Sequence, residues 1–542
     1  MASPPTIAAE PVTVAPTLWT PLSLPVFRLL WIAMLTENVC SWLLDMTNGW
    51  LMTSLSPSPL MVSLVQTASL LPILLFALPS GALTDIVSRR TILLWVEGTL
   101  AVFNGVLALL AYLDLLTGPV LLVLIFANGV AFAFGMPVWQ AVTAEVVPAA
   151  HLSSAFLLNG IAVNIARGIG PVLAGVLLAT AGGPTLAFAV NCAGFLFVWF
   201  AVRSWPSTAE SESRLPPERV LSAIVAGLRY TRFDANLRTV LLRVTAFVFF
   251  ATGFWAVAPL IGRGLIKLDA LGYGLWMTTF GLGAILGGYL MSRVVALVNI
   301  NIIVALNTVM MAGGMVAIGL FPIRAVAFPV MFVVGMAWMM TLGSFVMTVQ
   351  TNVPSWVRGR AVAIYFMAFQ GVIALSAAMW GLVAERFGLA TELIIAASGL
   401  VVALAATAWW KLSLGESTGN VLYGQFPALE LTPTLDATQT AAMVTFEYRI
   451  QESDRAAFLR LVAQAGVVRQ RNGATQWGVF EDLDQPGRWV ESFVVDSSAE
   501  MERIRQRTTA ADYAILQQVY ALHQGGGSPP PISRFLAPSN VS

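Results

Sequence analysis

The sequence predicts an all-α polytopic membrane protein that carries a small α+β domain after its last membrane span. Three observations support this fold class. Of the 542 residues, 57% are apolar and only 11% are charged, whereas soluble proteins average about 25% charged residues. Apolar runs of about twenty residues, enough to cross a hydrocarbon core about 30 Å thick, recur as far as Trp410. After Lys411 the chain becomes polar and shows alternating, strand-like patterns.

Twelve apolar runs, bounded by Pro, Gly or charged residues, predict twelve transmembrane helices. Helices fit these runs better than barrel strands, because barrel strands would alternate polar and apolar residues. The predicted helices begin near Phe27, Leu60, Thr91, Val120, Ala155, Leu186, Val240, Tyr273, Ile303, Val326, Ala361 and Leu393.

The spans repeat as two six-helix halves. The series Val147, Pro148, Ala155, Gly170, Ala174, Gly175 matches, at a constant offset, Val353, Pro354, Ala361, Ser376, Trp380, Gly381. Two repeated halves are the organisation of an alternating-access transporter. The predicted domains are a disordered tail (residues 1–25), an N-terminal six-helix bundle (26–204), a linker with an amphipathic helix (205–236), a C-terminal six-helix bundle (237–412), a linker (413–440) and a soluble α+β domain (441–542).

The distribution of positive charge predicts the orientation in a cell membrane. One set of span ends carries Arg28, Arg89, Arg90, Arg203, Arg214, Arg219, Arg229, Arg232, Arg238, Arg293, Arg358, Arg360 and Lys411, and the other carries mainly Arg263, Lys267, Arg324 and Arg386. Because positive charge is retained on the cytoplasmic side, both termini are expected there. A net charge of only +1 gives no sign of a nucleic-acid partner. The two cysteines lie in separate spans, and no metal or cofactor motif is present.

A charged loop between the second and third spans reads "GALTDIVSRR". Its Gly81, Asp85, Arg89 and Arg90 resemble the signature loop of the major facilitator superfamily, although Ser88 stands where that family usually has Gly. The segments "PVWQAVTAEVVP", "NIARGIGPVLAG" and "VPSWVRGRA" resemble the transmembrane secretion effector branch, which includes enterobactin-exporter-like permeases. The resemblance covers essentially the whole chain. It implies a transporter rather than an enzyme, an export direction, and a cytoplasmic position for this loop.

Asp85 predicts a gate in this loop, because a carboxylate at a helix end can accept charged hydrogen bonds from Arg side chains and from helix amides. Alternatively, Arg89 and Arg90 only fix the topology and Asp85 balances their charge. The equivalent loop of the second half keeps Arg293 and has no acid, so the gate is expected to be asymmetric.

The first span carries an unusual polar stripe. Glu37, Ser41 and Asp45 are spaced four apart, Asn48 follows, and Asn38 lies beside them. On a helix this spacing places the stripe on one face. Because ionisable groups are costly inside a bilayer, we expect the stripe to line an aqueous cavity and its carboxylates to exchange protons during transport. Alternatively, Glu37 and Asp45 form fixed ion pairs with Arg167 or Arg243.

The fifth span contains Arg167 followed by Gly170, Pro171 and Gly175. This resembles the Gly-Pro motif of exporters in the superfamily, in which small residues let helices pack closely. Arg167 is expected either to pair with a first-span acid or an anionic substrate, or to serve packing alone. The fourth span has Asn128 but no Arg, which departs from the drug-proton antiporter pattern. Arg358 and Arg360 open the eleventh span as a cytoplasmic loop motif.

The soluble domain reads as a strand ("MVTFEYRI"), a helix ending at Gly466, a hairpin across Asp484 to Gly487, a second helix after Ser497 and a strand near "ISRFLA". This order predicts a ferredoxin-like sandwich similar to the dimeric α/β-barrel group, and therefore possible dimerisation.

Three functions stay open at the level of sequence. The first is a proton-coupled exporter of a small amphiphilic solute such as a siderophore or a drug, in contact with membrane lipid. The second is a membrane-anchored enzyme whose tail carries the activity, and the third is a receptor or regulatory protein. An ATP-driven pump is excluded for this chain, because no phosphate-binding Gly-x4-Gly-Lys-Ser/Thr loop is present.

Overall fold

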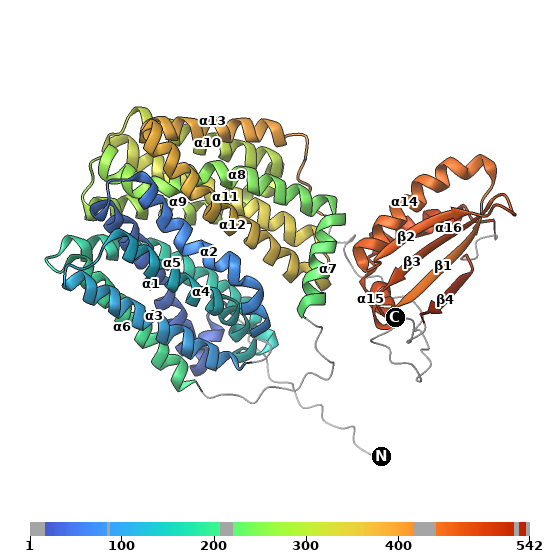
Figure 1. Ribbon diagram of the computed structural model, residues 1–542, viewed down its shortest axis with the longest axis horizontal. Coiled ribbons are helices and arrows are strands. Elements are labelled where there is room, and N and C mark those ends of the chain that lie inside the picture. Colours follow the sequence, from blue (N-terminus) through green and yellow to red (C-terminus); the bar gives the residue numbers. More distant parts are fainter. Residues whose placement is uncertain (1–16, 84–86, 206–219, 416–440, 525–529, 538–542) are drawn as a thin grey trace, which may run out of the picture.

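The computed structural model describes residues 17–83, 87–205, 220–415, 441–524 and 530–537. Two six-helix halves lie side by side, and a sheet domain lies beside one end of the second half (Figure 1). In the described part of the chain, twelve helices are long and apolar enough to cross a membrane. The predicted fold class is therefore confirmed. Residues 1–16 of the predicted tail, 206–219 of the first linker and 416–440 of the second linker fall outside the described residues.

The twelve spans are regular and long. The first half contains α1 (Pro25–Leu55), α2 (Pro59–Leu83), α3 (Arg89–Tyr112), α4 (Gly118–Val146), α5 (Leu152–Ala179) and α6 (Gly183–Ser204). The second half contains α8 (Ala235–Leu260, continued by the π-helical turn η3, Ile261–Leu265), α9 (Ala270–Leu297), α10 (Ile300–Leu320), α11 (Arg324–Asn352), α12 (Ser355–Phe387) and α13 (Leu389–Thr407). Each helix begins slightly before its predicted apolar run. In α1 and α12 the added first turn contains proline or polar residues.

Helix α7 (Val220–Phe233) lies outside the twelve spans and defines two ends of the molecule. We call the end next to α7, where α8 begins, the α7 end, and the opposite end, where α1, α5 and α8 finish and α9 begins, the far end (Figure 1). Two short 3-10 turns, η1 (Thr20–Ser23) and η2 (Ala149–His151), precede α1 and α5.

The C-terminal domain is a four-stranded sheet covered by helices. Its strands are β1 (Ala442–Arg449), β2 (Gln476–Glu481), β3 (Arg488–Val495) and β4 (Ile532–Leu536), and its helices are α14 (Arg455–Asn472, preceded by η4, Glu452–Asp454), α15 (Ser498–Arg507) and α16 (Ala510–Ala521). The strand order is β2-β3-β1-β4, and all neighbours are antiparallel. This is a ferredoxin-like arrangement in which α15 and α16 together take the place of the second helix.

The predicted end of α14 at Gly466 is wrong. The helix continues to Asn472 and ends at Gly473, whose φ of 151° suits glycine. A Cβ on Gly466 would clash with the indole ring of Trp477. Gly466 therefore makes room for a ring of the neighbouring strand and does not end the helix.

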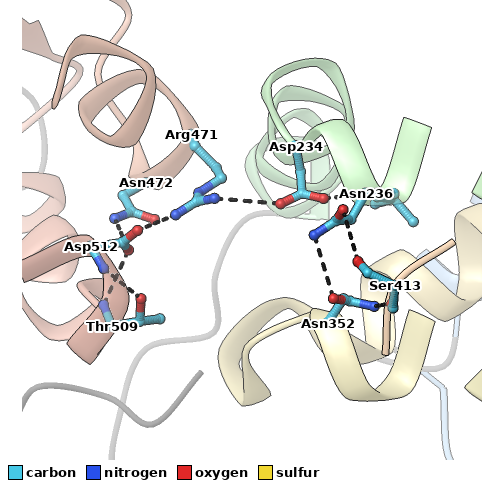
Figure 2. Close-up of polar contacts among 9 residues, drawn as sticks. Asp234, Asn236, Asn352, Ser413, Arg471, Asn472, Thr509 and Asp512 are labelled. Atoms are coloured by element: carbon cyan, nitrogen blue, oxygen red, sulfur yellow. Dashed lines mark hydrogen bonds and ion pairs between the residues drawn. The ribbon is translucent and has the colours of Figure 1, made fainter. Parts of the chain in front are cut away.

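Polar side chains fix this domain to the α7 end of the second half (Figure 2). Arg471 contacts both Asp512, within the domain, and Asp234, the residue that caps α8, with 3.4 Å between Arg471 Nη1 and Asp234 Oδ2. The Arg507 guanidinium stacks 4.4 Å from the ring centre of Trp356 in α12. Arg229 of α7 lies 3.6 Å from Glu500 of α15.

The chain leading out of α13 is fixed at the same place. Asn352 at the end of α11 donates to the Ser413 carbonyl at 2.5 Å, and Asn236 of α8 bonds both Asn352 and Ser413 (Figure 2). Burial and the Asp234 carboxylate raise the pKa of Tyr230, which lies under the Arg471 guanidinium. The side-chain contacts therefore join the domain to α7, to the start of α8 and to α12, while Asn352 of α11 holds the chain that leaves α13.

Candidate functional site

A cavity of about 500 Å³ lies within the first half of the molecule, a size that suits a drug-sized ligand. Its wall comes from α1, α2, α4 and α5 and includes Met34, Glu37, Asn38, Ser41, Leu44, Asp45, Asn48, Gln66, Ser69, Leu70, Ile73, Ile125, Asn128, Gly129, Phe132, Met136, Trp139, Gln140, Phe156, Asn159, Gly160 and Val163. Gln140 and Phe156 lie near the α7 end of their helices. The cavity therefore reaches from the middle of the half toward the α7 end.

The polar stripe of α1 forms one side of this cavity. Glu37, Asn38, Ser41 and Asp45 all line it. The Ser41 hydroxyl donates to the Glu37 carbonyl at 2.9 Å, and the Asn38 amide donates to the Met34 carbonyl at 2.7 Å. Glu37 is only 8% exposed, whereas Asp45 is readily accessible from the cavity. The helical spacing thus brings one accessible and one nearly buried carboxyl group to the same wall.

Arg167 and Arg243 contact groups other than Glu37 and Asp45, the acids with which they were expected to pair. Within the described part of the chain, neither Glu37 nor Asp45 forms an ion pair. The Arg167 guanidinium lies 5.6 Å from the ring centre of Trp42, and its Nη1 is 3.8 Å from Met339 Sδ. Arg243 donates to the Asn301 side chain at 2.7 Å. This arrangement favours the cavity-lining alternative for the first-span acids.

The cavity also contains groups that the sequence did not single out as a site. Gln66 and Ser69 come from α2 and Asn159 from α5. Asn159 donates to the Thr143 hydroxyl at 2.9 Å, which holds its amide in the wall. The sequence indicated these three residues only weakly, because each is a single polar residue in an apolar run.

A further carboxyl group lies behind the wall. Glu97 of α3 is fully buried, and the Trp139 indole N–H donates to its Oε1 at 3.3 Å, while Oε2 has no partner. The same indole interacts with Glu37, and the two carboxyl groups are close enough to repel each other when both are ionised. Sequence spacing cannot reveal this pair, because tertiary packing of three helices creates it.

The Gly-Pro motif closes the far end of the molecule. A Cβ on Gly170 would lie 2.5 Å from Trp42 Cβ, so this glycine lets α5 pack closely on α1. A Cβ on Gly175 would lie 2.9 Å from the Ala270 carbonyl oxygen, and one on Gly274 would lie 2.5 Å from the Pro171 carbonyl oxygen. The backbones of α5 and α9 are therefore in direct contact across the two halves.

The other junction between the halves, α2 with α12, is equivalent in the repeat. A Cβ on Gly381, the counterpart of Gly175, would lie 3.0 Å from Leu60 Cα. Beside it, Ser58 donates to Glu385 at 3.1 Å. Both junctions close the far end beyond the cavity.

A cationic side chain adds to this closure. Arg263 of η3 donates to Thr53 at 2.9 Å and Ser54 at 2.7 Å and lies 5.5 Å from the ring centre of Trp50. Trp50 in turn stacks on Tyr273 of α9 at 5.2 Å. The end of α1 is thus held by residues of the second half.

The charged loop is described only in part. Gly81 belongs to the last turns of α2, and Asp85 falls outside the described residues. Arg89 forms an ion pair with Glu145 of α4 at 2.8 Å. Arg90 donates to the Arg203 carbonyl at 2.5 Å and to the Val202 carbonyl at 3.3 Å, which caps the end of α6.

The "VRGRA" arginines lie at the start of α12. Arg358 is exposed and donates to the Val353 carbonyl at 3.3 Å. The Cβ of Arg360 lies 3.3 Å from the position that a Cβ would take on Gly227 of α7. These residues belong to the contact between α12 and α7, away from the cavity.

The arrangement can hold a solute of moderate size against acidic, amide and aromatic groups while the far end is closed. In the described residues, no group of three His, Cys, Asp or Glu side chains is placed to hold a metal ion. The site therefore offers binding groups and protonatable carboxyls.

Comparison with known protein families gives a match over nearly the whole chain. The family described as transmembrane secretion effector matches residues 16–541. Similar proteins include the staphyloferrin A transporter of Staphylococcus aureus (strain NCTC 8325 / PS 47), 22% identical over 361 residues, with 64% of this chain and 87% of that protein covered. Macrolide efflux protein A of Streptococcus pyogenes is 22% identical over 266 residues, with 49% of this chain and 65% of that protein covered.

Solved structures share the twelve-helix fold. The nucleoside transporter NupG superimposes with a TM-score of 0.61 at 13% identity, over 71% of this chain and 99% of that one. A bacterial homologue of the human lysosomal transporter Spinster gives a TM-score of 0.59 at 13% identity, over 72% and 97%. At this identity the likeness concerns the fold alone.

Proposed function

Because this chain belongs to the transmembrane secretion effector family of the major facilitator superfamily, and so is a secondary transporter and not an enzyme, we propose that it is a proton-coupled exporter. Its solute is small and amphiphilic, of the size of a siderophore or a drug. The relatives named for staphyloferrin A transport and macrolide efflux support this range.

The observation that carries the proposal is the pair of acids in the cavity, Glu37 and Asp45, without a cationic partner among the described residues. A buried carboxylate in a membrane protein is costly unless it faces water, a counter-charge or a proton. A transporter can therefore neutralise such a group alternately with a proton and with its solute, which couples the two movements.

The spacing of the two acids fits a relay. Eight residues separate Asp45 from Glu37, which is about 12 Å along a helix. Asp45 lies nearer the far end and is accessible, and Glu37 lies nearer the middle. A proton entering when the far end opens would meet Asp45 first and leave from Glu37 when the α7 end opens. Arg167, with its contacts to Trp42 and Met339, is a helix-packing group in this scheme.

The test is transport by the purified chain in sealed proteoliposomes with and without an imposed pH gradient. We expect a fluorescent amphiphile to be concentrated against its gradient only when the compartment that receives it is acidic. Asp45→Asn and Glu37→Gln should each abolish the response to the pH gradient. Gradient-driven accumulation by both variants at the wild-type rate would place the coupling site elsewhere.

We also propose that the α7 end faces the cytoplasm of the cell, with both termini there. The excess of Arg at the ends of the spans that meet α7 supports this orientation. A green fluorescent protein fused after residue 542 should fluoresce, because it folds on the cytoplasmic side. If this fusion does not fluoresce, and a reporter that works only outside the cytoplasm is active at the same position, the orientation is the opposite of the one proposed.

A further inference from the structure

The charge of the cavity wall narrows the class of solute. The wall contains the carboxyl groups of Glu37 and Asp45 and the side-chain amides of Asn38, Asn48, Gln66, Asn128, Gln140 and Asn159. In the described part of the chain, none of its residues is Lys, Arg or His. We propose that the cavity binds an amphiphilic organic cation, such as a protonated amine, with Glu37 and Asp45 as its counter-charges. This inference rests on the proposed function only in taking this cavity as the solute site.

An anionic solute would find no partner here. A polycarboxylate or another multiply charged anion would be brought next to two acids in a low-dielectric wall, where like charges repel strongly. The Arg167 guanidinium, which is the cation of α5, does not line the cavity and lies over Trp42. Electrostatics therefore select against anions and in favour of cations.

The remaining wall suits the apolar part of such a molecule. Phe132, Trp139 and Phe156 contribute aromatic surface, and Ile73, Ile125 and Val163 contribute aliphatic surface. Aromatic faces attract organic cations through their negative centres. A volume of about 500 Å³ accommodates a ring system with one charged group.

Glu97 explains how a proton competes with the cation. The charged and titratable groups near Glu37 are Cys40 on α1 and Glu97 on α3, while Asp45 lies about 12 Å farther along α1. Trp139 of α4 interacts with both Glu37 and Glu97. A single indole N–H cannot stabilise two buried carboxylates, so a proton and the cation compete for this pair. A cation at Glu37 replaces that proton, which then leaves through the cavity. Binding of the cation should therefore release protons.

The experiment uses two probes of equal shape and opposite charge, tetraphenylphosphonium and tetraphenylborate. Equilibrium dialysis against the purified full-length protein measures their binding at pH 7.5 and 5.5. We expect saturable binding of the cation that weakens at the lower pH, and weaker binding of the anion. Glu37→Gln and Asp45→Asn should each weaken cation binding by about tenfold, as expected for the loss of one charged contact.

Two further variants separate the loss of the charged contact from a general loss of structure. Glu37→Asp preserves the charge and should retain most of the cation binding. Glu392→Gln is the matched control, since Glu392 is a fully buried carboxyl of the second half that packs against Gly253, outside the cavity; its cation binding should equal that of the wild type. Gel filtration confirms that each variant is folded.

Tighter binding of tetraphenylborate than of tetraphenylphosphonium, or equal cation binding by wild type, Glu37→Gln and Asp45→Asn, would overturn the inference. The two proposals fail separately. Charge-selective binding without pH-driven export contradicts only the coupling mechanism. Export of a neutral or anionic solute driven by the pH gradient, without binding of the cation, contradicts only the solute class.

Discussion

Arg89 and Arg90 are neighbours in sequence but hold different parts of the first half. Arg89 pairs with a carboxylate of α4, and Arg90 bonds carbonyl oxygens at the end of α6. Both contacts fix helix ends at the α7 end. These two arginines therefore stabilise the packing of helix ends in addition to setting the topology.

Asp85→Asn should reduce turnover more than it reduces the amount of protein in the membrane. If Asp85 holds the gate, the change removes charged hydrogen bonds worth about 1.5 to 3 kcal/mol, while Arg89 and Arg90 stay in place. Transport rate per inserted molecule, in proteoliposomes, is the measurement. The double change Arg89→Ala with Arg90→Ala serves as comparison and should damage both insertion and transport. If Asp85→Asn transports normally, the loop acts in topology alone.

His523 makes part of the C-terminal domain sensitive to pH. Its Nδ1 accepts a hydrogen bond from the Arg449 backbone N–H at 3.0 Å, which requires a neutral ring. Burial, and then the charge of Arg449, lower the pKa of His523 below its usual value of about 6.5. The folded domain thus binds fewer protons than the unfolded chain. The stability from this group is complete above pH 6.5 and is lost as the pH falls through the folded pKa.

Hydrogen exchange of the full-length protein should detect this loss. Protection of the β1 segment that contains Arg449 should fall between pH 7.5 and 5.5, after correction for the intrinsic exchange rate. His523→Gln, whose side chain does not titrate, should show constant protection over this range. The same decline in both proteins would assign the effect to another group.

At the scale of elements, close glycine contacts hold the two halves together at the far end. The backbones of α5 and α9 touch at Gly175 and Gly274, and α12 touches α2 at Gly381. A transporter that alternates must separate these pairs, and small residues allow both the tight contact and its release.

Gly274→Ala should shift the equilibrium away from the state with the far end closed. The added Cβ would lie 2.5 Å from the Pro171 carbonyl oxygen, and overpacking of this kind costs about 1 to 3 kcal/mol. A cysteine placed at Ser63, which packs against Gly381, should react faster with a membrane-impermeant maleimide from the far side.

Gly313→Ala is the matched control for this experiment. A Cβ on Gly313 of α10 would meet no atom within 4 Å, so the reaction rate at position 63 should not change. Equal rates in Gly274→Ala and wild type would show that this contact does not limit opening.

The sequence predicted the elements far better than their contacts. Apolar length placed all twelve spans, and four-residue spacing grouped Glu37, Ser41 and Asp45 on one face. The pairing of Glu97 with Trp139, and of Arg263 with the end of α1, joins residues 42 and 210 positions apart. Such contacts depend on how helices pack, and no periodicity within one helix encodes them. Gly466 shows the same limit, because it lies in α14 and the ring that it makes room for, Trp477, belongs to β2.

At the scale of the whole molecule, we expect the C-terminal domain to be an accessory to the twelve-helix transporter. Truncation after Ser417 should leave insertion and transport in place, because the spans and the cavity lie before that residue. Membrane fractionation and proteoliposome transport provide the measurement. Loss of all insertion in the truncated chain would contradict this prediction.

The isolated domain, residues 441–542, should fold and dimerise. The face of its sheet that carries Met443, Val494 and Phe535 places apolar side chains in register, with Met443 37% and Phe535 50% exposed. Light scattering after gel filtration should give a dimer mass, and Phe535→Lys a monomer. Val467→Lys, on an exposed position of α14, is the control and should stay dimeric. A monomeric wild-type domain would refute the dimer.

Because Arg471, Arg507 and Glu500 fix the domain to the second half, its outer edge should report rotations of that half. The residues that contact the domain belong to α7, to the cap of α8 and to α12, so we expect it to move together with the second half if the two halves rock against each other. A small rotation at the membrane becomes a larger displacement at the edge of the sheet. A donor dye on an exposed residue of β4 and an acceptor at the first turn of α3 would therefore record each half-cycle of a single transporter as a step in energy transfer.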